Sequence, residues 1–135
     1  MADSNTLHVV VVTPERAELD ARASAVVLPM FDGERGIQPG HSAFVGQLRP
    51  GELRITIGED TKRYYIDGGF AQVAAGVVNV LTAKATPAEK VTADAATAAR
   101  AAADALPATN GVERETRAKA VARAQGLAAV ARRNG

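Results

Sequence analysis

Short runs of apolar and β-branched residues follow one another through the first two-thirds of the chain. Residues 7–13 are rich in valine and stop at Pro14, and residues 25–30 form a continuous apolar run, as in a strand covered on both faces. Residues 53–57 alternate between apolar and polar positions, which is typical of a strand with one buried face. Glycine and proline turns separate these runs every 8–12 residues or so, roughly the spacing of strands in sandwiches and barrels. The pattern predicts an antiparallel β-sandwich or flattened barrel over residues 1–86.

Weaker signals place the remaining strands between the turns. Further strands are expected at residues 16–21, 43–48, 62–67, 70–74 and 77–83. A turn at Arg49-Pro50-Gly51 should end the second of these, and Gly68-Gly69 should mark a bend or a bulge.

The pattern changes at Thr86-Pro87, where β-favouring residues give way to alanine. Residues 87–135 contain 18 alanines among 49 residues and no isoleucine, phenylalanine or tyrosine. Alanine is the best helix former, and Thr86-Pro87 offers an N-cap and a first-turn proline for a first helix. Residues 107–111 should break that helix, and a second is expected from about Val112 to Arg132. We therefore predict a β domain at residues 1–86 and a helical hairpin at residues 87–135.

Both predicted helices carry only a thin apolar stripe. The stripes consist of Val91, Ala95, Ala98, Ala102 and Leu106 in the first helix, and of Ala120, Ala124, Leu127 and Ala131 in the second. Because burial stabilises by about 0.8 kcal/mol per CH₂, alanine stripes should dock weakly. We expect the hairpin to be able to leave its docking site. Gly126 should also weaken the second helix by about 0.8–1.0 kcal/mol relative to alanine.

Composition and charge exclude several classes of function. The 135 residues have a net charge of +1, which does not favour general binding of nucleic acid. The absence of cysteine excludes a disulfide framework and a thiolate metal site, and two histidines cannot form a metal cluster by themselves. No stretch reaches the roughly 20 apolar residues of a membrane span, and Met1–Thr6 lacks the features of a signal peptide. We expect no cofactor, no metal and no direct membrane insertion.

The most distinctive stretch is Gly33–His41, with the sequence Gly-Glu-Arg-Gly-Ile-Gln-Pro-Gly-His. Three glycines and a proline predict a shaped loop, which should present the carboxylate of Glu34, an apolar tip at Ile37 and the imidazole of His41. His41 and Glu34 could be imagined as an acid–base pair, but no nucleophile and no phosphate-binding, serine-hydrolase or zinc-protease motif accompanies them. For His41 we therefore weigh a hydrogen bond within the loop against a contact with a partner.

Four motifs occur in a fixed order along the first 86 residues. They are LHVVVVTPE at residues 7–15, GERGIQPGH at 33–41, LRPGELRI at 48–55 and GGFAQV at 68–73. This ordered set resembles the epsilon subunit of bacterial F-type ATP synthase over about residues 7–86, and the alanine-rich hairpin is similar in length and layout. The resemblance implies a β-sandwich of about ten strands followed by two C-terminal helices. It also implies a non-catalytic rotor subunit of the central stalk, peripheral on the cytoplasmic face of the bacterial inner membrane.

The resemblance also implies which residues contact partners. By position, the residues facing the c-ring loops or the gamma subunit would be Glu34, Ile37, His41 and Ser42, and Thr13 would lie at the gamma contact. In this family the hairpin inhibits ATP hydrolysis. It lies against the sandwich when compact, and inserts beside gamma among the alpha and beta subunits when extended. The basic residues that would then meet acidic residues of beta are Arg114, Arg117, Lys119 and Arg123. The alternatives are pure loop shaping by the glycines and solvated charges at Glu34 and on the helix.

One motif departs from the family. Some members bind ATP on the hairpin through an Ile/Leu-Asp-x-x-Arg-Ala pattern, where this chain has Lys90-Val91-Thr92-Ala93-Asp94-Ala95. Val91 replaces the acid and Asp94 replaces the arginine, so a phosphate would meet a carboxylate in place of a cation. We therefore predict weak or absent ATP binding.

Two other classes of function stay open on the residues alone. A small enzyme or ligand-binding sandwich would hold His41 and Glu34 in one pocket. A generic adaptor would use the basic hairpin to bind acidic partners. Deletion of residues 87–135 separates the adaptor from the rotor subunit, because only the adaptor would lose its partner.

Overall fold

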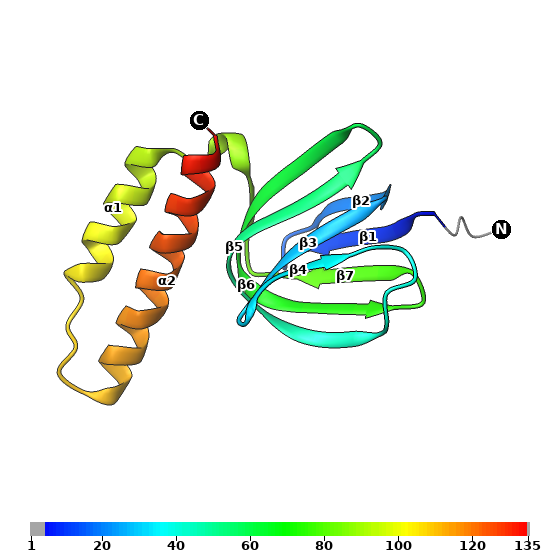
Figure 1. Ribbon diagram of the computed structural model, residues 1–135. Coiled ribbons are helices and arrows are strands. Elements are labelled where there is room, and N and C mark those ends of the chain that lie inside the picture. Colours follow the sequence, from blue (N-terminus) through cyan, green and yellow to red (C-terminus); the bar gives the residue numbers. More distant parts are fainter. Residues whose placement is uncertain (1–4, 135) are drawn as a thin grey trace.

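In the computed structural model, which describes residues 5–134, strands occupy the first part of the chain and helices the last (Figure 1). Residues 1–4, which carry most of the stretch that predicts no signal peptide, lie outside the described residues, as does residue 135. The strands are β1 (Leu7–Val12), β2 (Ala17–Ala23), β3 (Ala25–Met30), β4 (Gly33–Ile37), β5 (Phe44–Ile57), β6 (Asp60–Ala74), β7 (Val77–Leu81) and β8 (Ala85–Pro87). A short 3₁₀ turn, η1 (Ala88–Lys90), leads to the helices α1 (Ala93–Asp104) and α2 (Gly111–Arg133). This order confirms the predicted β unit followed by two packed helices.

The strands follow one hydrogen-bonded path in the order β2-β1-β7-β6-β5-β3-β4, with β8 added on β6. The long strand β6 pairs with β8 over Tyr64–Ile66 and with β7 over Phe70–Ala74. Among the described strands, β1 and β7 are parallel, whereas the other neighbours are antiparallel. The predicted antiparallel arrangement therefore holds at the other described pairs and fails at this one, because β7 turns back from β6 and meets β1 running in the same direction.

Two long strands explain why the described residues form eight strands where about ten were expected. β5 runs without interruption through Arg49-Pro50-Gly51, where we predicted a turn. β6 continues through Gly68-Gly69 and keeps one register with β5 on both sides, so the glycines bend the strand without a bulge. Their φ angles of 77° and 118° are ones that residues with side chains rarely adopt. Each long strand therefore corresponds to two predicted ones.

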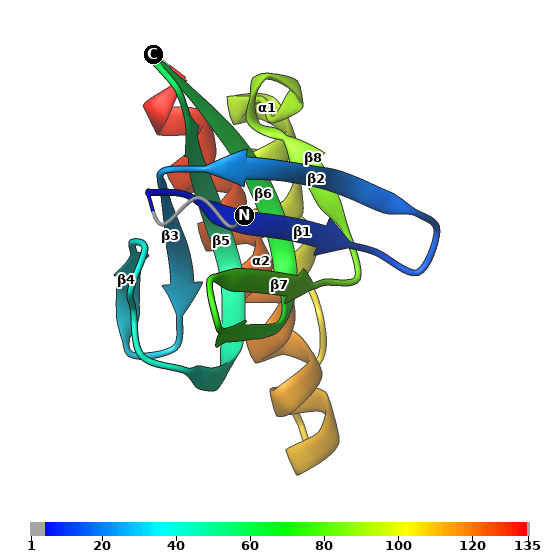
Figure 2. The same ribbon diagram turned by 90° about the vertical axis from the view of Figure 1, so that its right-hand side faces the viewer.

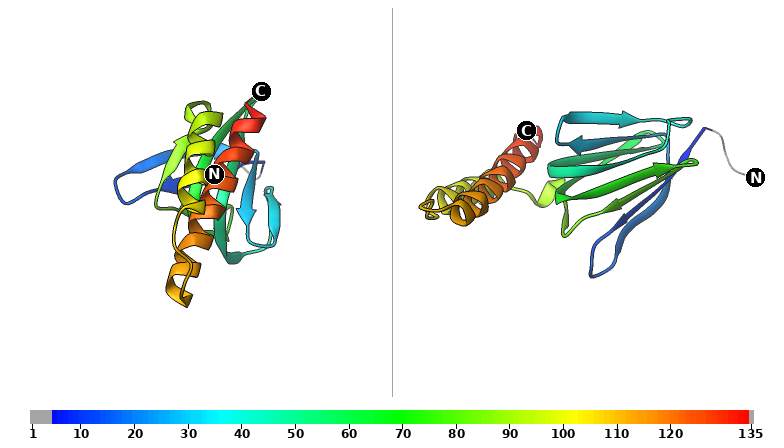
Figure 3. Two further views of the ribbon diagram at one scale, coloured as in Figure 1. Left: turned by 90° about the vertical axis from the view of Figure 1, so that its left-hand side faces the viewer. Right: turned by 90° about the horizontal axis from the view of Figure 1, so that it is seen from below.

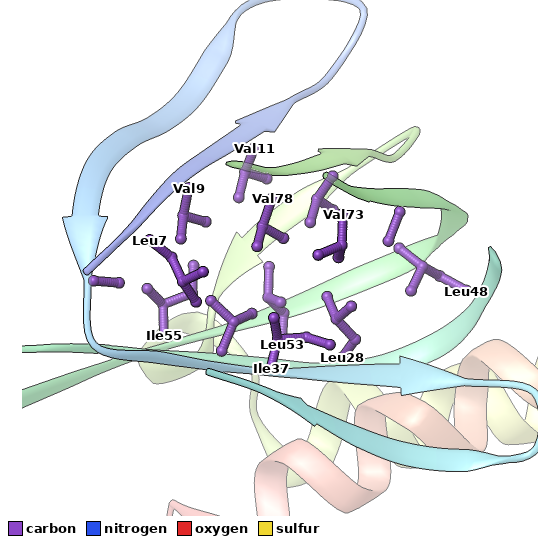
Figure 4. Close-up of a cluster of buried hydrophobic side chains, with 14 of the residues drawn as sticks. Leu7, Val9, Val11, Leu28, Ile37, Leu48, Leu53, Ile55, Val73 and Val78 are labelled. Atoms are coloured by element: carbon purple, nitrogen blue, oxygen red, sulfur yellow. The ribbon is translucent and has the colours of Figure 1, made fainter. Parts of the chain in front are cut away.

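The core of the β unit is built from valine, leucine and isoleucine side chains. Figure 4 shows Val9 and Val11 of β1, Val78 of β7 and Leu53 of β5 pointing toward one another between the strands. These positions are essentially inaccessible to solvent. Full burial of each such side chain stabilises the fold by about 1.5–3 kcal/mol, so the β unit has a core of its own, separate from the helices.

The helices pack against each other on one side of the β unit. Figure 2 shows β1, β2 and β7 on the side away from them, and Figure 3 shows the helix pair from two further directions. α1 begins at Ala93, where the Thr92 hydroxyl accepts a hydrogen bond of 3.0 Å from the Ala95 amide. The predicted start at Thr86-Pro87 is wrong, because those residues extend β8 and pair with β6. The division between residues 86 and 87 into two domains stays a prediction.

The later start also changes which face of α1 is buried. Its buried residues are Ala96 and Ala103, whereas Ala95, Ala98 and Ala102 of the predicted stripe are exposed. Val91 is buried but precedes the helix. In α2 the predicted stripe agrees better with the structure: Ala124 is buried, and Ala120, Leu127 and Ala131 are partly buried.

Candidate functional site

The glycine-rich stretch is an edge strand followed by a short loop. Gly33–Ile37 form β4, which pairs with β3 across a tight turn at Phe31-Asp32, and only residues 38–43 remain as a loop. Ile37 pairs with Val26, and its side chain is 0% exposed within the core (Figure 4). The prediction of an apolar tip at Ile37 is therefore wrong, because strand pairing turns this side chain inward.

His41 and Ser42 are the predicted contact residues that the structure exposes at this loop. The Nδ1 atom of His41 donates to the Ser42 carbonyl oxygen at 2.8 Å, and its ring meets Phe44 edge-on, with 5.5 Å between centroids. The Arg35 guanidinium lies over the same Phe44 ring at 4.7 Å. This stacking orders the loop tip, beside a shallow hollow of about 360 Å³ lined by Gly36, Gln38, Pro39, Gly40 and His41.

Glu34 does not line this hollow. Its carboxylate accepts two hydrogen bonds from Arg54 of β5, at 3.0 and 3.2 Å. The Arg54 guanidinium holds the pKa of Glu34 below its ordinary value, mainly through these hydrogen bonds. The structure therefore gives no support to an acid–base pair of Glu34 and His41.

Thr13 serves the β1–β2 turn. Its side chain is 8% exposed, and its hydroxyl donates to the Arg16 carbonyl oxygen at 3.2 Å. The Thr13 amide donates to the same oxygen at 2.9 Å. Thr13 thus fixes the turn that follows Val12 and offers little side-chain surface of its own.

The predicted basic face of α2 is largely engaged within the chain. Arg123 pairs with Asp67 of β6 at 2.9 Å, Arg117 donates to the Asp104 carbonyl oxygen of α1 at 3.3 Å, and Lys119 pairs with Glu115 at 3.4 Å. Arg114 is exposed, and no ion pair joins it to another described residue. Three of the four predicted inhibitory residues would therefore exchange an internal partner for an external one.

The predictions missed a surface that crosses strands β1, β7, β6 and β5. Side chains in register share a face of a sheet, and two registered rows point outward here. We name this surface the uncharged sheet face; it consists of Val10, Val12, Val45, Gln47, Phe70, Gln72, Asn79 and Leu81. Val45 is 70%, Phe70 56% and Leu81 53% exposed. The signal in the sequence was valine at every position from 9 to 12, which makes both faces of β1 apolar.

Within residues 5–134, no three potential metal ligands gather in one group, and no helix is long and apolar enough to cross a membrane.

Comparison with known proteins explains this combination of a sandwich, an ordered loop and a docked hairpin. Residues 6–88 match the family model for the ATP synthase delta/epsilon chain, beta-sandwich domain. The chain belongs to the ATP synthase epsilon-chain family. This confirms the resemblance carried by the four motifs. As a family member, the chain is a non-catalytic subunit of the ATP synthase complex.

Relatives cover nearly the whole chain, including the hairpin. The ATP synthase epsilon chain of Rhodopirellula baltica is 46% identical over 121 residues, which are 90% of this chain and 94% of that one. The epsilon chain of Fuscovulum blasticum is 36% identical over 127 residues, covering 93% and 96%. A chain in the Euglena gracilis mitochondrial ATP synthase, solved with OSCP, F1 and the c-ring, superposes with a TM-score of 0.77 at 28% identity, covering 93% of this chain and 81% of its own. A chain from the Tetrahymena thermophila enzyme superposes with a TM-score of 0.76 at 15% identity, covering 93% and 96%, which shows the shared fold.

Proposed function

We propose that this epsilon-family chain is a rotor subunit of the central stalk, which joins the gamma subunit and the c-ring and restrains ATP hydrolysis through its hairpin. The two superposed structures come from assemblies described as containing a c-ring, and one is described as central stalk with c-ring. The observation that carries the proposal is the uncharged sheet face, since an exposed apolar surface of this kind is typical of a protein interface.

The uncharged sheet face is the surface proposed to bind gamma. Phe70 and Leu81 lie opposite each other in register, with Val12 beyond Leu81, so their exposed side chains form one continuous row. Interface centres are depleted in charged residues, and the eight residues of this surface include none; they include one aromatic residue, Phe70. Thr13 supports it by fixing the turn that follows Val12.

The loop of residues 38–43 is proposed to face the polar loops of the c-ring. His41 and Ser42 supply its exposed polar atoms, and stacking on Phe44 holds them in one pose. Glu34 contributes through its ion pair with Arg54, which ties the edge strand β4 to β5. A stiff contact suits a subunit that transmits rotation. The chain would then sit peripherally at the cytoplasmic face of the bacterial inner membrane, held by its partners.

The hairpin is proposed to inhibit hydrolysis only after it leaves the sandwich. In the docked pose Arg123 is paired with Asp67, and Arg117 and Lys119 also have internal partners. Contact with acidic residues of beta requires these basic side chains to be freed. The docked pose described here therefore corresponds to a non-inhibitory state.

Deletion of residues 93–135 tests the division of labour. A rotor subunit should still bind purified gamma, while control of ATP hydrolysis in the reconstituted complex should change. Loss of gamma binding on deletion would favour the adaptor, whose partner surface is the basic hairpin.

A further inference from the structure

The hairpin touches the sandwich mainly through the C-terminal half of α2. Val130 is buried against Tyr65, Ala88 and Val91, with Leu127 beside them. A cavity of about 580 Å³ lies between α2 and the strands, and its α2 lining runs from Glu115 to Arg133. Direct packing of α2 on the rest of the chain includes Gly126, which lies against Pro50, and Val130 near the end of the helix.

Asn134 connects the end of α2 to two other segments. Its Nδ2 donates to the carbonyl oxygens of Ala88 and Val91, at 2.7 and 3.1 Å, in the link before α1. Its Oδ1 accepts from Nη1 of Arg63 at 2.7 Å. One side chain thus joins the link, the sandwich and the helix end.

Arg63 is in turn held by a buried carboxylate. Glu52 has a side chain 5% exposed, and it accepts from Nε of Arg63 at 2.9 Å and from Nη1 of Arg54 at 2.9 Å. Arg133 of α2 lies 3.4 Å from the same carboxylate. Arg63 also donates to the Val130 carbonyl oxygen at 3.3 Å, one of the last carbonyls of α2. A cation at this position suits the negative end of a helix.

Glu52 and Arg63 both belong to the sandwich, so their pairing involves no residue of the hairpin. A buried carboxylate needs its cations, so Glu52 keeps Arg63 oriented toward the helix end. Preorganisation of this kind reduces the entropy lost on docking. The sandwich therefore presents a ready-made receptor, and Arg133 and Asn134 bring the complementary groups.

We propose that this contact is a latch: Arg133 and Asn134 engage the Glu52–Arg63 receptor and decide whether the hairpin is docked. The basic residues nearer the interhelical loop, Arg114 and Arg117, do not decide it. Release of the latch frees Arg123 from Asp67, so the latch would set how readily the proposed inhibitory face becomes available. That last consequence rests on the proposed function, whereas the latch itself is a property of the isolated chain.

Pulsed EPR on the full chain tests the latch. The sequence has no cysteine, so spin labels at Arg22→Cys on β2 and Val112→Cys at the start of α2 report one distance. The chain that carries only the two labels should give a single narrow distribution of the distance between them. Asn134→Ala and Arg63→Gln should each raise the undocked, broadly distributed fraction by about tenfold, as expected when a hydrogen bond that involves a charged group is lost. The matched controls Arg132→Ala and Arg117→Gln should keep the narrow distribution.

The latch is contradicted if Asn134→Ala stays docked, or if Arg117→Gln undocks the hairpin equally. Thermal unfolding of the sandwich should be unchanged in Asn134→Ala, which keeps the test valid if Arg63→Gln proves unstable. In the reconstituted complex, Asn134→Ala should strengthen inhibition of hydrolysis. If EPR shows that Asn134→Ala undocks the hairpin but the rate of ATP hydrolysis does not change, the latch is supported and the proposed inhibition is refuted.

Discussion

Gly126 of α2 lies against the backbone of Pro50 in β5, so closely that a Cβ at position 126 would stand 2.8 Å from the Pro50 carbonyl oxygen. Real Cβ atoms essentially never approach another heavy atom within 3.0 Å. The helix can therefore reach the strand only with glycine at this position. From the sequence, Gly126 is only a weak point in the helix; in the structure it is the residue that permits docking.

Gly126→Ala should release the hairpin although it improves helix propensity. Forcing a methyl group into this contact should cost about 1–3 kcal/mol, more than the roughly 1 kcal/mol that alanine returns to the helix. Limited trypsin digestion should show faster cleavage at Lys119 and Arg123. The matched control is Gly111→Ala, where a Cβ meets nothing within 4 Å and docking should be unaffected. If trypsin cleaves Gly126→Ala and the unaltered chain at the same rate, docking of the hairpin does not require glycine at this position.

Ile37→Ala should destabilise the sandwich as a core substitution does. The side chain is 0% exposed, so its loss should lower the free energy of unfolding by about 2–5 kcal/mol. Val45→Ala, at a position 70% exposed, should change it by no more than about 0.5 kcal/mol. Urea unfolding followed by circular dichroism measures both. If both variants change the free energy of unfolding by a similarly small amount, Ile37 lies at the surface, as predicted from the sequence.

The ion pair of Glu34 with Arg54 predicts a pH-dependent contribution to stability. Because the folded-state pKa of Glu34 lies below the ordinary value of 4.5, the contribution is fully present above that value and is lost as the pH falls through the folded-state pKa. Since Glu34 is 43% exposed, Glu34→Gln should cost less than about 1 kcal/mol near neutral pH. The difference should shrink toward zero in acid. In a chain that already carries Arg54→Gln, Glu34→Gln should no longer change the free energy of unfolding. A stability difference between Glu34→Gln and the unaltered chain that grows in acid would contradict this account.

The hairpin should bind ATP weakly or not at all. Val91 is buried against Tyr65 and Val130, and Asp94 places a carboxylate in the first turn of α1. A phosphate there would lack a cation and meet a negative charge. Calorimetric titration of the full chain with ATP should show no saturable heat. A micromolar dissociation constant would refute this prediction, and Asp94→Arg tests whether the missing cation is the cause.

The sequence predicted the elements that depend on side-chain periodicity. The valines of β1 and the alternation of Leu53, Ile55 and Ile57 identified core strands, and the alanine-rich segment identified two helices. Gly33–Ile37 were misassigned because glycine in a strand resembles glycine in a loop. Gly36 pairs with Val27 through its backbone alone, which leaves no trace in the side-chain pattern.

Other features depend on contacts between distant segments and could not be predicted. Thr86 and Thr92 both offer a hydroxyl that could cap the first helix. Because Thr86 pairs with Tyr65 in the sheet, the helix begins after Thr92. The bond between Arg63 and Asn134 joins residues 71 positions apart. No local pattern marks such a pair. The uncharged sheet face, by contrast, could have been found, because its outward positions in β1 are valine as well.

Binding of gamma by the uncharged sheet face is the central claim, and affinity of the full chain for purified gamma subunit tests it most directly. Phe70→Glu combined with Leu81→Glu should weaken binding by at least about a hundredfold, because charges at an interface centre are left buried and unpaired. Val112→Glu, at an even more exposed apolar residue on the hairpin, should bind as the unaltered chain does. If the folded double variant binds gamma with unchanged affinity, the proposed contact surface is contradicted.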